Sequence, residues 1–143
     1  MAVHELSHMS YKVAKIISFC YGHRLLNYEG KCRHPHGHNG RLEIELTASQ
    51  LDARGMVVDF TDIKRLIAGW IDTLLDHKMI LHREDPLLPI LQKMGEPVYI
   101  MDENPTVENI AKLIYHYAVS QHLPVSEIRL WESETSYASY GGV

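Results

Sequence analysis

The sequence has 143 residues, a length that fits one globular domain, residues 1–143, with its own hydrophobic core and no need of disulfide bonds. Hydrophobic residues make up 45% of the chain and charged residues 22%, the balance of a soluble globular protein, and the formal net charge is −4. This acidic balance argues against a dedicated nucleic-acid-binding protein, which normally carries a basic surface. No apolar run approaches the roughly 20 residues that a membrane span needs, so we expect no membrane association.

The first ten residues have no basic start followed by a long apolar run, and we expect no secretion signal there. Two cysteines are too few for a disulfide framework and favour a reducing, cytoplasmic environment. Histidine is the unusual residue. The chain has 10, and four of them (His23, His34, His36 and His38) fall within a short stretch.

Two strands are predicted in the first third of the chain. Residues 12–21 are rich in Ile, Val, Phe and Tyr, which favour a strand. Residues 41–47 alternate strictly, with Leu42, Ile44 and Leu46 on one face and charged side chains on the other. This period of two predicts a half-buried strand, antiparallel to the first.

Two helices follow. A helix over 60–76 begins at Asp59 or Thr61 and carries an apolar stripe at helical spacing. The stripe consists of Ile63, Leu66, Ile67, Trp70, Ile71, Leu74 and Leu75. A stretch with three prolines then predicts an irregular connection with a short turn of helix. Thr106 is the N-cap expected for the second helix. The buried stripe of that helix is Val107, Ile110, Ala111, Ile114 and Ala118.

Residues 126–132 and 135–140 predict two more strands. The order β-β-α-α-β-β indicates an α+β domain, in which both helices pack on one face of a four-stranded antiparallel sheet. Such a sheet has two edges with unpaired backbone groups, and we expect these edges to pair with other subunits.

Three histidines are placed to bind one metal ion. His36 and His38 are two residues apart and share one face of an extended chain, and His23 ends the first strand. A hairpin would therefore bring all three imidazoles together. Three neutral imidazoles suit Zn²⁺ and leave an open coordination position, as a catalytic site requires. The alternative is a histidine-rich solvated loop, and we favour the metal site; His34 is interpreted as a loop residue.

Cys32 lies four residues before His36 and has two interpretations. Its thiolate either closes a structural zinc site or acts beside the metal as a base or nucleophile. The same loop is locally positive, a charge that suits an anionic substrate such as a phosphate but is also common in an ordinary hairpin loop. Its cationic residues are Arg24, Lys31, Arg33 and Arg41.

Asp76 and His77 end the first predicted helix. The imidazole either interacts with the helix carbonyls or forms an acid/base pair with Asp76, which requires the helix to break at residue 76. Glu132 shares a strand face with apolar residues. A carboxylate there either reaches solvent or binds, in a pocket, a heterocycle that offers an amino group and a ring N–H.

Together these residues resemble the 6-pyruvoyl-tetrahydropterin synthase / 6-carboxy-tetrahydropterin synthase family. The matching elements, in chain order, are Phe19-x-x-x-His23, Cys32-x-x-x-His36-Gly37-His38, residues 55–60 (GMVVDF), residues 75–77 (LDH), residues 105–109 (PTVEN) and Trp131-Glu132. The resemblance implies a T-fold that joins edge to edge into rings, usually a dimer of trimers with active sites between subunits. It also implies zinc at the three histidines, Cys32 as the base, Asp76 and His77 as a second acid/base element, and substrate binding by Glu132 and Thr106.

The resemblance implies a zinc-dependent lyase acting on 7,8-dihydroneopterin triphosphate. Within the family, three residues between the cysteine and the first histidine of the HGH pair are typical of the carboxy-tetrahydropterin enzymes of queuosine biosynthesis, whereas pyruvoyl-forming enzymes commonly have five. This chain has three: Arg33, His34 and Pro35. One departure is visible, because Tyr21 stands where relatives usually carry a small residue, and it could narrow the pocket. A non-enzymatic zinc- or pterin-binding module is the alternative of another class.

Overall fold

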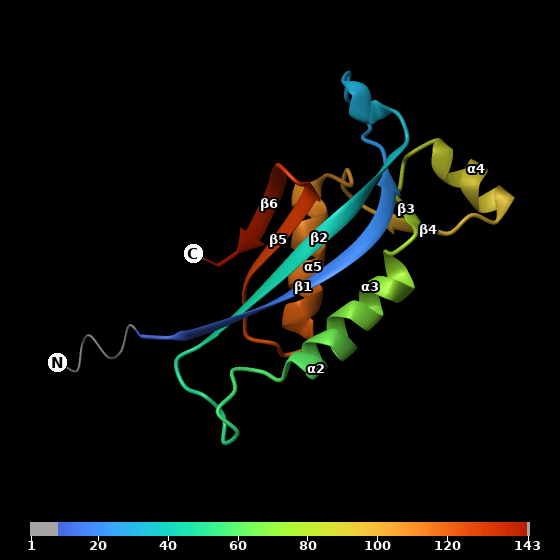
Figure 1. Cartoon of the computed structure of the whole chain (residues 1–143). Coiled ribbons are helices and arrows are strands. Elements are labelled where there is room, and N and C mark those ends of the chain that lie inside the picture. Colours follow the sequence, from blue (N-terminus) through green and yellow to red (C-terminus); the bar gives the residue numbers. More distant parts are fainter. Residues whose placement is uncertain (1–8, 143) are drawn as a thin grey trace.

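The computed structural model describes residues 9–142, and its centre is one curved, mixed sheet of six strands (Figure 1). The strand order is β4-β3-β1-β2-β5-β6. The strands are β1 (Tyr11–His23), β2 (His36–Ala48), β3 (Lys78–His82), β4 (Val98–Met101), β5 (Val125–Ser133) and β6 (Ser136–Gly141). The two long strands β1 and β2 form the expected antiparallel hairpin, in which His23 lies opposite His36.

Two helical segments cover one face of the sheet (Figure 1). The first is continuous and consists of α2 (Phe60–Ile63), a π-helical stretch η2 (Lys64–Ala68) and α3 (Gly69–Leu74); Asp59 caps it by accepting a hydrogen bond from the backbone N–H of Thr61 at 2.9 Å. The second is α5 (Val107–Ser120), capped by Thr106 as predicted. Apolar residues of both helices meet the inward row of β1, β2 and β5 in one core.

The predicted stripes are confirmed with one exception. Ile63, Ile67, Ile71 and Leu75 of the first helix are fully buried, but Leu74 is 37% exposed. The stripe residues of α5 are buried or half-buried against the same core. Full burial recurs every four residues from Ile63 to Leu75, and Leu74 lies one position off this row, at the edge of the stripe.

The prediction of four strands and an all-antiparallel sheet is wrong, although the fold class is right. β3 pairs in parallel with the end of β1, and β4 pairs in parallel with β3. Both strands come from the proline-rich stretch that was expected to be irregular. They have five and four residues and no alternating pattern. The helix α4 (Leu87–Met94) connects them as a crossover, and the three prolines lie outside both strands: Pro86 caps α4, Pro89 is in its first turn and Pro97 precedes β4. Gly95, with φ of 77°, ends α4.

β4 and β6 are the two edges of the sheet. A small 3-10 turn, η1 (Lys31–Arg33), lies in the loop at the tip of the β1–β2 hairpin. Across residues 9–142, no helix combines the length and the apolar character that crossing a membrane requires.

Candidate functional site

The three histidines expected to bind a metal converge at the end of the β1–β2 hairpin. His23 is the last residue of β1 and is 2% exposed; His36 and His38 begin β2 and project to the same face. The ring centroids are 4.5 Å apart for His23 and His36, 5.0 Å for His23 and His38, and 4.9 Å for His36 and His38. The antiparallel register places these rings together because His23 and His36 are directly opposite partners.

Backbone carbonyls orient two of the rings. His23 Nδ1 lies 2.7 Å from the carbonyl oxygen of Pro105, and His36 Nδ1 lies 2.7 Å from that of His34. A carbonyl only accepts, so each Nδ1 carries the hydrogen and each Nε2 presents a lone pair. Sequence reasoning missed both carbonyls, because neither side chain type nor spacing marks a main-chain acceptor.

The three histidines direct their Nε2 atoms toward a common space. His36 Nε2 is buried and has no hydrogen-bond partner among the described residues, and the Nε2 atoms of His23 and His38 are 3.1 Å apart. Burial lowers the pKa of His23 and of His38, as does the charge of His36, although the Glu132 carboxylate opposes this shift. Neutral imidazoles with convergent lone pairs are what a divalent cation such as zinc requires.

Glu132 joins this group, a contact that the sequence did not predict. Its Oε1 atom lies 2.9 Å from His38 Nε2 and 3.3 Å from His23 Nε2. The four side chains His23, His36, His38 and Glu132 offer ligand atoms that lie within 4.8 Å of one another. β5 positions the carboxylate because Leu42 of β2 pairs with Leu130, two residues earlier. The set fits a metal ion held by three imidazoles, with a carboxylate at its open side.

Asp76 and His77 form the pair that required a break in the helix. α3 ends at Leu74, and His77 has a positive φ of 58°. The Nδ1 atom of His77 lies 2.9 Å from Asp76 Oδ2, and Asp76 Oδ1 accepts the backbone N–H of Cys20 at 2.9 Å. Burial opposes the shift, but the Cys20 N–H and the His77 ring lower the pKa of Asp76. The carboxylate therefore stays ionised and orients the imidazole.

Within the subunit, the thiol beside this pair is Cys20. Cys20, Asp76 and His77 offer ligand atoms within 4.8 Å of one another, and Cys20 Sγ lies 3.1 Å from Asn39 Oδ1. Cys32 lies in η1, and within residues 9–142 it belongs to neither of the two groups. Side chains of a strand alternate between its two faces, so Cys20 and His23 point to opposite faces of β1. This alternation was the signal in the sequence that could have placed Cys20 away from the histidine group.

Two of the four cationic residues expected around the hairpin loop are engaged in ion pairs. Arg24 donates to Asp85, which is only 1% exposed, through Nε at 2.8 Å and through its terminal nitrogen. Arg41 donates to Glu43 at 2.8 Å. Lys31 and Arg33 therefore remain the cations of the hairpin tip without a carboxylate partner among the described residues. Thr106, expected to bind substrate, accepts the backbone N–H of Asn109 at 3.1 Å as a helix cap.

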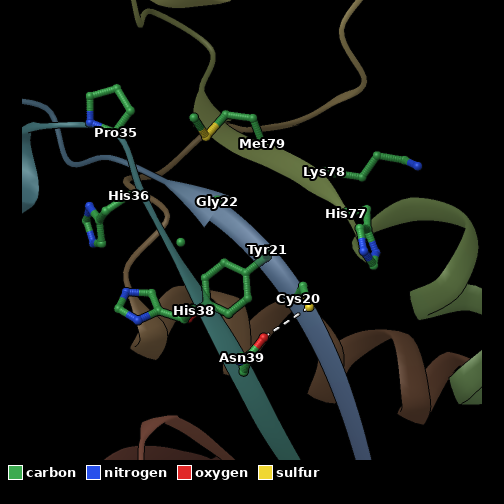
Figure 2. A pocket seen from close by; sticks show the side chains of 11 residues that line it. Cys20, Tyr21, Gly22, Pro35, His36, His38, Asn39, His77, Lys78 and Met79 are labelled. Atoms are coloured by element: carbon green, nitrogen blue, oxygen red, sulfur yellow. Dashed lines mark hydrogen bonds between the residues drawn. The ribbon is translucent and has the colours of Figure 1, made fainter.

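One cavity of about 610 Å³, within the usual size range of small-molecule sites, is lined by two members of the histidine group and by His77 of the Asp76–His77 pair. His36 and His38 line one side and His77 the other, with Cys20 between them (Figure 2). Tyr21 also lines it, and its ring stands beside His38 (Figure 2). Burial, together with the negative charge of Glu132, raises the pKa of Tyr21.

Comparisons with known proteins agree with this geometry. The sequence model of the family described as 6-pyruvoyl tetrahydropterin synthase matches residues 12–143. Proteins named 6-carboxy-5,6,7,8-tetrahydropterin synthase are 38% identical in Rickettsia conorii, over 88% of this chain and 96% of that protein, and 32% identical in Haemophilus influenzae, over 91% and 98%.

Solved structures share the fold. An uncharacterized protein of Wolinella succinogenes superposes with a TM-score of 0.78 at 27% identity, covering 94% of this chain and 99% of that chain. The 6-pyruvoyl tetrahydropterin synthase of Caenorhabditis elegans superposes with a TM-score of 0.68 at 21% identity, over 94% and 97%.

Proposed function

The chain belongs to the 6-pyruvoyl tetrahydropterin synthase family, and we propose that it is a zinc-dependent 6-carboxy-5,6,7,8-tetrahydropterin synthase of queuosine biosynthesis. In this proposal the substrate is 7,8-dihydroneopterin triphosphate, and the products are 6-carboxy-5,6,7,8-tetrahydropterin, acetaldehyde and triphosphate. The oxygen balance between substrate and products requires one water as well. The observation that carries the proposal is the convergence of three imidazoles, joined by the Glu132 carboxylate, beside a cavity that His77 of the Asp76–His77 pair also lines.

His23, His36 and His38 would hold the metal, and zinc suits a set of three neutral imidazoles. When bound, zinc supplies Lewis-acid polarisation of the substrate's side-chain oxygens, which makes the adjacent C–H bond more acidic. The Pro105 and His34 carbonyls fix two of the rings, so their lone pairs are directed before any ligand arrives.

Proton transfer is assigned to Cys32, Asp76 and His77. Cys32 as a thiolate would accept the proton from the substrate side chain, and His77, oriented by Asp76, would return protons to the ring system. Within one subunit Cys32 is not part of the Asp76–His77 group. We therefore propose that the two elements meet between subunits, which pair through the exposed edges β4 and β6 into a dimer of trimers.

Binding of the pterin ring is assigned to Glu132, with Thr106 on the neighbouring loop. The Glu132 carboxylate can accept the amino group and ring N–H of the pterin in one plane. Lys31 and Arg33 are the cations left to bind the triphosphate, since Arg24 and Arg41 are paired with carboxylates. A thiolate base needs reducing conditions, and both cysteines are free, in support of a cytoplasmic protein.

The most direct test is incubation of the zinc-loaded protein with 7,8-dihydroneopterin triphosphate, followed by identification of the products by mass spectrometry. Carboxy-tetrahydropterin and acetaldehyde are expected. A pyruvoyl product would instead identify the second candidate, 6-pyruvoyl-tetrahydropterin synthase. The three-residue spacing between Cys32 and His36 and the names of the relatives at 32–38% identity favour the carboxy product.

A non-enzymatic zinc- or pterin-binding module is the alternative of another class. It required Cys32 to close the zinc site as a fourth ligand. Among the described residues the group around the three imidazoles contains Glu132 and not Cys32, which favours the lyase. X-ray absorption at the zinc edge of the ligand-free protein distinguishes the two, since a sulfur neighbour would support the closed site.

A further inference from the structure

The hydroxyl of Tyr21 is buried and has no hydrogen-bond partner among the described residues. The whole residue is only 2% exposed, although it lines the cavity that holds the histidine group. A hydroxyl that is removed from water without a partner destabilises the fold, so such groups are rare in folded proteins. An unpaired donor on a residue that lines a binding cavity therefore points to a ligand atom that completes it.

Packing holds the Tyr21 ring in one place. Its centroid lies 5.4 Å from that of Phe19, 5.3 Å from that of His23 and 5.6 Å from that of His38. Gly40, on the facing strand, leaves the room that the ring needs, because a Cβ atom there would lie 3.1 Å from Tyr21 Cε1. The hydroxyl is therefore carried by a rigid side chain next to two of the three proposed zinc ligands.

The neighbouring polar groups are already engaged with one another. Glu132 Oε1 contacts the Nε2 atoms of His38 and His23, and the Nδ1 atom of His23 is bonded to Pro105. None of the described residues places an acceptor within hydrogen-bond distance of the Tyr21 hydroxyl. A polyhydroxylated side chain, held at the three imidazoles, would bring oxygen acceptors into this space.

We propose that Tyr21 is a specificity-determining residue that donates a hydrogen bond to an oxygen of the hydroxylated side chain at C6 of the pterin. This inference rests on the proposed function, because it takes a pterin as the occupant of the cavity. The site then selects pterins with a hydroxylated side chain, since a ligand that lacks it leaves the buried hydroxyl unpaired. The interaction concerns the side chain alone, and ring binding by Glu132 does not depend on it.

The experiment uses the zinc-loaded protein and two probes, 7,8-dihydroneopterin and 6-methyl-7,8-dihydropterin, which has the same ring but no hydroxyls. Isothermal titration calorimetry measures both affinities for the wild type and for Tyr21→Phe, which removes the hydroxyl and keeps the ring. We expect Tyr21→Phe to bind dihydroneopterin about tenfold more weakly, as for one lost hydrogen bond, and to bind the methyl compound equally well. Zinc content should be unchanged.

Gly40→Ala provides a second variant that leaves the hydroxyl in place but crowds the ring. We expect it to reduce the preference for dihydroneopterin in the wild-type background and to have little effect on that preference in the Tyr21→Phe background. This non-additivity would show that Gly40 acts through the position of the hydroxyl.

Four results would overturn the inference. If Tyr21→Phe weakens the affinity for both probes equally, Tyr21 shapes the pocket and does not recognise the pterin side chain. A lower melting temperature of the metal-free Tyr21→Phe protein would show that the hydroxyl has a partner within the protein itself. A wild type that binds the methyl compound but does not prefer dihydroneopterin would remove the inference and leave pterin binding intact, whereas a wild type that binds neither probe would remove the proposed function with it.

Discussion

The Nδ1 atom of His77 lies 2.9 Å from the Oδ2 atom of Asp76, the residue that precedes it in the chain. Neighbouring side chains of a regular helix do not face each other, and the contact exists because α3 ends at Leu74 and His77 adopts a left-handed backbone conformation. A non-glycine residue in this conformation is uncommon and is typically maintained by its surroundings. Here the backbone N–H of His77 donates to the carbonyl of Cys20 at 2.7 Å, which anchors the turn to β1.

We expect Asp76→Asn to lower turnover by about 10²- to 10³-fold, because the amide cannot stabilise the charged imidazole as the carboxylate does. Zinc content and melting temperature should change little. The measurement is steady-state kinetics with 7,8-dihydroneopterin triphosphate. Asp72→Asn is the matched control, since Asp72 is an exposed carboxylate of the same helix. An Asp76→Asn enzyme as active as this control would exclude the acid/base role.

His36→Ala should abolish tight zinc binding. Its Nε2 atom is buried without a partner in the described structure. Loss of a group that hydrogen-bonds to a metal ligand lowers metal affinity roughly 10- to 100-fold, and loss of the ligand itself should lower zinc affinity by more. Zinc content by atomic absorption, after dialysis against a weak chelator, measures the effect. His34→Ala is the control, because the side chain of His34 lies outside the histidine group while its carbonyl remains. Equal zinc loss in both variants would contradict the assigned ligand set.

The metal-free protein should lose stability as the pH falls below about 6.5, the ordinary pKa of histidine. Burial lowers the pKa of His23 and His38 in the folded state. These two histidines have a pKa near 6.5 in the unfolded chain and a lower pKa in the folded protein. Between the two pKa values the unfolded chain binds more protons than the folded one, so a fall in pH favours unfolding in that interval. The loss is complete once the pH falls below the folded pKa values.

Urea denaturation of the metal-free protein at pH 7.5 and at pH 5.5 measures this effect, and the unfolding free energy should be smaller at pH 5.5. The carboxylates with lowered pKa, such as Asp85, change the unfolding free energy only at more acidic pH, so they do not affect the comparison between pH 7.5 and pH 5.5. His38→Gln should reduce the difference between the two pH values. An unchanged pH dependence in that variant would indicate that other groups cause it.

Cys32→Ala should abolish turnover while zinc binding and folding remain, because the thiolate is assigned as the proton acceptor. Cys20→Ala tests the competing thiol, which the structure places beside Asp76 and His77. Both variants are assayed for single-turnover product formation and for zinc content. If only the Cys20 variant is inactive, the base is the thiol within the same subunit, and the assignment of Cys32 is wrong.

Glu132→Gln should retain zinc but bind 7,8-dihydroneopterin more than tenfold more weakly, because the amide both donates and accepts and cannot receive two N–H groups. Calorimetry with the zinc-loaded protein measures the affinity. Glu134→Gln is the control, since Glu134 is exposed in the turn after β5. Loss of zinc from Glu132→Gln would instead make the carboxylate a metal ligand, as its contacts with His23 and His38 allow.

The amino-acid pattern alone determined the elements that bury one face along their whole length. The alternation of Leu42, Ile44 and Leu46 predicted β2, and the helical stripes predicted the two core helices. The two-residue spacing of His36 and His38, with His23 at the end of the preceding strand, predicted the histidine group. These features are local, because a period of two or of 3.6 residues sets which side chains share a face.

Tertiary structure decided the features that depend on residues far apart in the chain. β3 and β4 are too short to show a period and exist because they pair with β1 and with each other. Glu132 lies 2.9 Å from His38 across the sheet, and Cys20 lies beside Asp76. Register and packing bring these groups together, and both are set by long-range pairing that a single stretch of sequence does not contain.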